Sequence, residues 1–182
     1  MGILIAAVVL LTALSLFNLV LTLAVIRRLR TPEAAPGRGA PRMPDLDEVP
    51  SGAPVPDFTA RSAAGIPVSS ADRLGDRAVY AFFDTACGVC EGQLRPLADF
   101  VVRAGLAPEQ VIVFIGDEKG EARRYASVVE DRTTVVVQAA GEDTGRVFGL
   151  RGVPAFVLAD ADGTVVRSGV EVGDLEPALA GT

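Results

Sequence analysis

Short apolar runs in the second half of the chain constrain its fold more than any other feature. Two of them, AVYAFF at 78–83 and VIVFI at 111–115, are apolar throughout and have the length of a strand. Such unbroken runs are typical of strands buried on both faces, as in a parallel sheet. Segments with helical spacing of apolar residues follow each run, at about 88–103 and 118–130. This alternation predicts an α/β domain with a central sheet flanked by helices.

Further elements are expected at both ends of this series. Two short strands, DFTA at 57–60 and IPVS at 66–69, would form an N-terminal β-hairpin about the turn at Gly65. A further strand, a short helix, a late hairpin about the turn DADG and a closing helix are expected at 134–138, 143–148, 155–168 and 174–179. Because the late hairpin adds antiparallel strands to parallel ones, the central sheet should be mixed.

Residues 3–26 contain no charged side chain. A helix needs about 20 apolar residues to cross a bilayer core. A cleaved signal peptide would have a basic residue before a shorter apolar run, whereas here the run is long and arginines follow it directly. We therefore predict one uncleaved transmembrane helix at 3–26 that contacts membrane lipid. Polar residues along one face of it could bond to a partner helix or back to their own helix: Thr12, Ser15, Asn18 and Thr22.

Residues 31–55 are rich in proline and glycine and lack a hydrophobic period, so we interpret them as a flexible linker. The globular domain is then predicted to span 56–182. The chain has a net charge of −6 and no basic stripe, which argues against binding of nucleic acid. It has no histidine, so Ser-His-Asp and Cys-His catalytic sites and histidine metal ligands are excluded. We expect neither a metal nor a bound cofactor.

The two cysteines lie together in the sequence CGVC, where a predicted strand gives way to a predicted helix. Cys87 would lie at the helix N-terminus, where free N–H groups and the helix dipole stabilise a thiolate. Cys90 follows one turn later on the same side and could attack a mixed disulfide formed at Cys87. A purely structural disulfide would close a very small loop and stabilise little. The alternatives are a purely structural disulfide or one half of a metal site between subunits. The spacing favours a redox pair.

Two stretches, VPDFTARSAAGIPVSSADRLGDRAVYAFFDTACGVC and GVPAFVLADADGTVV, resemble the membrane-anchored thioredoxin-like proteins of the TlpA and MauD type. The resemblance spans about residues 52–180. It implies a thioredoxin-like fold with an N-terminal hairpin extension, and thiol–disulfide exchange with protein substrates and an upstream redox partner. Thioredoxin-type folds place a cis-proline beside the disulfide, and the position of Pro154 before a strand favours this over an ordinary strand-initiating proline. Val153 and Pro154, together with the apolar Val89, are then expected to bind the substrate.

The chain departs from the pattern of these relatives at three positions near the cysteines. Ala86 replaces a bulky residue, Ala81 replaces the buried acid of thioredoxins, and Pro96 lies one position later in the helix than usual. Without the buried acid, the inner cysteine needs another proton acceptor, and the candidates are Asp84, Glu91 or solvent.

The sequence therefore predicts a membrane-tethered protein thiol–disulfide oxidoreductase. One alternative is a peroxiredoxin-like thiol peroxidase, which shares the early PDF sequence, although Asp84 stands where such a site needs threonine. The other is a non-catalytic binding module for a membrane partner. Topology is contested, because Arg27, Arg28 and Arg30 follow the apolar run and favour a cytoplasmic domain. The resemblance implies the opposite, extracytoplasmic face, where disulfides persist, and we favour that face.

Overall fold

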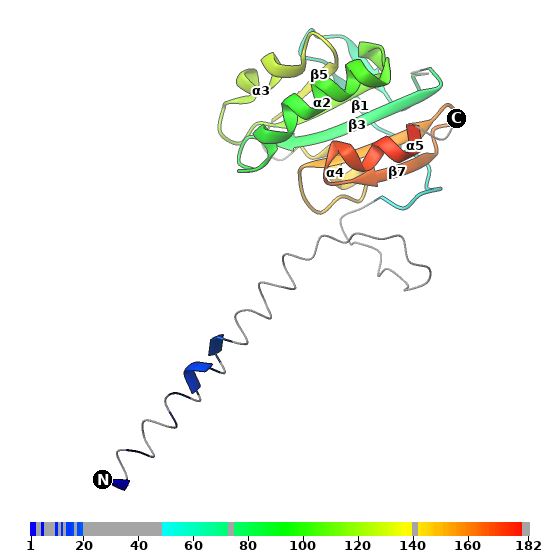
Figure 1. Cartoon of the computed structure of the whole chain (residues 1–182). Coiled ribbons are helices and arrows are strands. Elements are labelled where there is room, and N and C mark those ends of the chain that lie inside the picture. Colours follow the sequence, from blue (N-terminus) through cyan, green and yellow to red (C-terminus); the bar gives the residue numbers. More distant parts are fainter. Residues whose placement is uncertain are drawn as a thin grey trace. The chain divides into compact units, whose positions relative to one another are not determined.

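Figure 1 shows the computed structural model of the whole chain. It describes residues 49–72, 75–139 and 142–179, together with scattered positions among residues 1–19. The chain divides into two compact units, Met1–Pro41 and Arg42–Thr182. In the first unit, every described residue from Gly2 to Leu19 is helical.

Most of residues 3–26, for which the sequence predicts a transmembrane helix, lie outside the described residues, and so do residues 31–48 of the predicted linker. Within the described part of the chain, no helix combines the length and the apolar character that crossing a bilayer requires. The transmembrane helix, its lipid contacts and its helix partner stay predictions.

A five-stranded mixed sheet forms the centre of the second unit, with the strand order β5-β4-β3-β6-β7 (Figure 1). Its strands are β3 (Arg77–Asp84), β4 (Val111–Gly116), β5 (Thr134–Gln138), β6 (Ala155–Asp160) and β7 (Val165–Gly169). β4 is parallel to both β3 and β5, whereas β6 is antiparallel to β3 and β7. The mixed sheet predicted from the order of the elements is confirmed.

Alternating side chains of β3 divide the apolar core into two halves, one on each face of the sheet. Val79, Ala81 and Phe83 point to the half that is shared with α2 (Cys90–Ala104) and α3 (Ala122–Val129). The same face receives the C-terminal elements η2 (Val172–Leu175) and α5 (Glu176–Leu179), while η1 (Pro108–Gln110) leads into β4. This face carries the helix that begins at the redox pair.

The opposite face of the sheet is covered by α4 (Thr144–Val147) and by a separate hairpin of β1 (Thr59–Arg61) and β2 (Pro67–Ser69). Phe58, next to β1, meets the ring of Tyr80 on β3 edge to face, with centroids 5.8 Å apart. Such a pair contributes about 0.5–1.5 kcal/mol beyond the burial of its area. The predicted N-terminal hairpin therefore exists and closes this half of the core.

Helix α2 runs without interruption from the redox pair to the far end of the domain. Pro96 lies inside it, so the unusual position of this proline does not break the helix. The helix ends before Gly105, whose φ of 64° is a conformation that residues with a side chain rarely adopt.

Residues 49–55 belong to the folded unit, although their composition predicted a linker as far as residue 55. They run along the outer edge of β7, where Gly52 N donates to Val165 O at 2.7 Å and Ser168 Oγ donates to Val49 O at 2.8 Å. The Val49 side chain is buried, with 6% of its surface exposed. An edge position tolerates proline because half of its backbone groups face away from the sheet, so composition did not reveal this pairing.

Helix α3 begins four residues later than the predicted residue 118. Every other end of a helix or strand predicted between residues 57 and 179 lies within two residues of the observed end. Gly120 has a φ of 72°, which is not helical, and Asp117 Oδ1 accepts from Glu121 N at 2.8 Å and from Ala122 N at 3.0 Å. A carboxylate that satisfies free N–H groups in this way fixes where a helix starts.

Candidate active site

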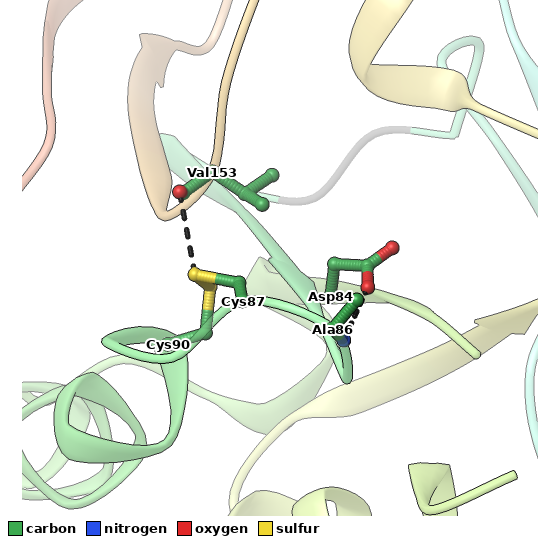
Figure 2. The surroundings of a disulfide bond; sticks show 5 residues. All are labelled: Asp84, Ala86, Cys87, Cys90 and Val153. Carbon is green, nitrogen blue, oxygen red and sulfur yellow. Dashed lines mark hydrogen bonds between the residues drawn. A yellow bond between two sulfur atoms is a disulfide. The ribbon is translucent and has the colours of Figure 1, made fainter. Parts of the chain in front are cut away.

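The two cysteines lie in the turn that leads from β3 into α2 (Figure 2). They form a disulfide, with their Cα atoms 5.5 Å apart. Cys87 is partly exposed, whereas Cys90 is the first residue of α2 and is 0% exposed, within the apolar core. The outer sulfur is therefore the one that a large substrate can reach.

Hydrogen bonds from the end of β3 hold this turn in shape. Asp84 O accepts from Cys87 N at 3.1 Å, and Asp84 Oδ1 accepts from Ala86 N at 2.6 Å (Figure 2). An aspartate side chain that accepts from the N–H two residues on forms an Asx turn, which favours a sharp change of direction. Asp84, proposed from the sequence as a proton acceptor, thus also shapes the turn.

The loop before β6 lies directly against the outer cysteine. The Val153 carbonyl oxygen is 3.4 Å from Cys87 Sγ (Figure 2), and the Val153–Pro154 peptide bond is cis, as its position in the sequence favoured. A disulfide sulfur carries no hydrogen, so this is a contact in the oxidised protein, and a Cys87 thiol would be placed to donate to the same oxygen. Val153 and Pro154 are partly exposed and Val89 is 66% exposed, so all three are accessible to a substrate.

A pocket of about 780 Å³ opens beside the outer cysteine. Its lining comes from the cysteine turn, from the ends of β4 and β5, and from the loop before β6, and includes Ala86, Cys87, Gly116, Gln138 and Val153. Ala86 presents only a methyl group to this pocket. The pocket therefore leaves open space beside the Cys87 sulfur.

Glu91, the second candidate proton acceptor, is engaged in an ion pair on the surface. Its Oε2 accepts a hydrogen bond from Arg124 Nη2 on α3, and this bond lowers the pKa of Glu91 below the usual value. A carboxylate with a lowered pKa is a weaker base. Glu91 is therefore a weaker base than an unpaired glutamate.

The structure brings two further residues to the turn that the sequence patterns did not single out. Thr85 is buried beneath the turn, and Gly116 lies at the end of β4, opposite Asp84 in the strand pairing. A lone threonine and a lone glycine have no motif of their own. The only available signal was the position of Thr85 between a buried strand and the cysteine pair.

A redox-spaced disulfide at the start of a helix, faced by a cis-proline loop on a mixed sheet, defines a thioredoxin-like protein. Residues 50–181 match the model of the family described as Redoxin, and the chain belongs to that family. No curated protein matches the chain. The thioredoxin-like part of the resemblance seen in the sequence is thus confirmed, while the TlpA and MauD type is a finer assignment that stays a prediction.

Solved structures of thiol–disulfide oxidoreductases share this fold. The thioredoxin domain of such an enzyme from Bacteroides vulgatus is 17% identical, with a TM-score of 0.57 over 72% of this chain and 96% of that chain. A thio-disulfide isomerase from Thermus thermophilus is 22% identical, with a TM-score of 0.56 over 72% and 96%. A secreted disulfide oxidoreductase of Mycobacterium tuberculosis, homologous to E. coli DsbE, is 21% identical, with a TM-score of 0.56 over 69% and 96%. At these identities the likeness establishes the fold.

Proposed function

We propose that the protein is a thiol–disulfide oxidoreductase that acts on protein substrates through Cys87 and Cys90. The observation that carries this proposal is the unequal exposure of the two sulfurs. Cys87 is partly exposed and borders a pocket, whereas Cys90 is 0% exposed and lies within disulfide-bonding reach of it. A nucleophile must meet the substrate, while a resolving thiol needs to meet only the nucleophile.

The reaction needs two exchange steps. In the reducing direction, the Cys87 thiolate attacks one sulfur of a substrate disulfide, the bond between the two substrate sulfurs breaks, and the first substrate thiolate leaves. The Cys90 thiolate then attacks the Cys87 sulfur of the mixed disulfide, and the second substrate thiolate leaves. Two electrons pass to the substrate, whose thiolates take up protons, and the Cys87–Cys90 disulfide forms. A partner dithiol regenerates the protein, and oxidation of a substrate dithiol runs every step backwards.

Asp84 is the better placed of the two acidic candidates for accepting the Cys90 proton. It is partly buried, belongs to the turn that carries both cysteines, and borders the same pocket as Cys87. Glu91 is exposed and held by Arg124. Solvent entering the pocket is the alternative route for the proton.

We also propose that residues 3–26 anchor the protein in a membrane and that the redox domain faces the extracytoplasmic side. Support comes from the uncharged run itself and from the resemblance to membrane-anchored relatives. Substrates would then be exported or membrane-associated proteins, and the electron partner would act on the same side. The arginines after the run favour the opposite topology, which makes orientation a matter for experiment.

Trapping of mixed disulfides in cells tests the two cysteine roles. If Cys87 attacks and Cys90 resolves, Cys90→Ser leaves substrates attached to Cys87, visible as bands on a non-reducing gel that a reductant removes. Cys87→Ser should trap far fewer, because Cys90 is buried, and the double variant should trap none. Equal trapping by both single variants, or none by either, would contradict the assigned roles.

A further inference from the structure

A buried threonine ties the cysteine turn to the loop that follows β4. Thr85, two residues before Cys87, is 3% exposed. Its N–H donates to Gly116 O at 2.9 Å, and its Oγ1 accepts from Lys119 N at 3.0 Å. Its hydroxyl also faces Asp117 Oδ1 at 3.5 Å, a long and therefore weak donation. Backbone and side chain of one residue thus hold the turn to a single loop.

That loop is itself fixed to two other elements. Asp117 Oδ1 accepts from Glu121 N and Ala122 N at the start of α3, and Asp117 N donates to Gln138 O at the end of β5 at 3.1 Å. Through Thr85, the cysteine turn is therefore attached to a support that is anchored on both sides.

Gly116 makes room for the other residue that shapes the turn. A Cβ added at Gly116 would lie 2.4 Å from Asp84 Oδ2, closer than real side chains come. Gly116 does not have a positive φ, so the backbone would accept alanine, but the Asp84 carboxylate would have to move away from the new methyl group. The Asp84 carboxylate, which accepts from Ala86 N, thus depends on the same loop for its position.

We propose that Thr85 is a positioning residue of the redox site, with the Gly116–Lys119 loop as its support. The idea rests on the proposed function of Cys87 as the attacking thiolate. The Thr85 hydroxyl keeps Cys87 in the turn just before the N-terminus of α2 and against Val153. The effect of a helix end on a charge falls off within about one turn, and a misplacement of about 1 Å can slow a reaction up to about a hundredfold. Losing the hydroxyl would also leave Lys119 N–H without its acceptor.

The test compares Thr85→Val with Thr133→Val in the full chain. Thr133 is a matched control, because it is also buried, at 5% exposure, and its Oγ1 donates to Val129 O at 2.9 Å at the far end of α3. Exchange is measured as the rate at which the reduced protein cleaves 5,5′-dithiobis(2-nitrobenzoate), and the Cys87 pKa as the midpoint of iodoacetamide alkylation against pH.

We expect Thr85→Val to slow exchange about tenfold and to raise the alkylation midpoint of Cys87, because its thiolate loses stabilisation. Thr133→Val should change neither the exchange rate nor the midpoint, although it should lower thermal stability by a similar amount. Thr85→Ser should restore the wild-type exchange rate and midpoint. Gly116→Ala would displace the Asp84 carboxylate in the same turn and should shift the midpoint of Cys87 in the same direction. This variant replaces Thr85→Val if Thr85→Val does not fold.

Equal effects of Thr85→Val and Thr133→Val on rate and midpoint would overturn the proposal, since Thr85 would then act on stability alone. Failure of the proposed function looks different. The wild-type protein would then react with the small disulfide but exchange with no protein disulfide such as that of insulin, while the alkylation midpoints would still report on Thr85.

Discussion

The reactivity expected of Cys87 comes from its place in the turn between β3 and α2. The first turn of α2 has N–H groups without helical acceptors, and these favour a thiolate at the helix tip. Glu91 in that turn is negative, but Arg124 is paired with it, so the two charges largely offset each other. Cys90 lies in the apolar core, where a charged form is disfavoured.

Alkylation of the reduced protein against pH should therefore separate the two thiols. In a Cys90→Ser variant, Cys87 should react with a midpoint below the free value of about 8.5. The pKa of Glu91 is lowered by its hydrogen bond with Arg124, so Glu91 stays ionised at neutral pH and should add no step near the Cys87 midpoint. In a Cys87→Ser variant, Cys90 should react slowly throughout. A Cys87 midpoint at or above about 8.5 would mean that the helix end does not act on this sulfur.

At the scale of elements, the sequence predicted what depends on local pattern and missed what depends on contacts between distant segments. The apolar runs predicted β3 and β4 because a strand that is buried on both faces needs an apolar residue at nearly every position. The start of α3 depends on the conformation of Gly120 and on the Asp117 carboxylate, and helical spacing alone could not show this. In the site, CGVC and Pro154 were recognisable from spacing and position. Thr85 bonds to residues more than thirty positions away, and the sequence next to Thr85 gives no sign of these bonds.

The segment along β7 provides a stability test at this scale. Val49→Ala removes two methyl groups from a side chain that is 6% exposed, and should lower the free energy of unfolding by about 1–3 kcal/mol. Val166→Ala is the matched control on β7, because Val166 is 41% exposed and should cost less than about 1 kcal/mol. Thermal unfolding of both variants measures the difference. Equal unfolding temperatures would mean that residues 49–55 behave as linker after all.

At the scale of the whole second unit, the register of β7 shows where the chain enters the fold. Val49 bonds to Ser168, which pairs with Val157, only three residues beyond Pro154 in β6. Val157 in turn pairs with Tyr80 in the middle of β3, so the chain enters the fold beside the middle of the sheet. The C-terminal helix α5 is tied instead to the last turn of α2, where Arg103 and Glu176 form an ion pair at 2.8 Å. A tether formed by residues 31–48 would then join the domain beside the edge strand β7.

Protease access to residues 31–48 can decide on which side of the membrane the domain lies. If the domain is extracytoplasmic, protease added to intact cells stripped of their wall should cut this proline-rich segment and release a fragment that contains residues 49–182. Folded domains resist cleavage because their backbone is packed and hydrogen-bonded, so the fragment should persist. A cytoplasmic protein in the same cells must stay intact, as a control for lysis. If Arg27, Arg28 and Arg30 set the orientation instead, the chain will be protected in intact cells and cut only after lysis, which would reverse the proposed topology.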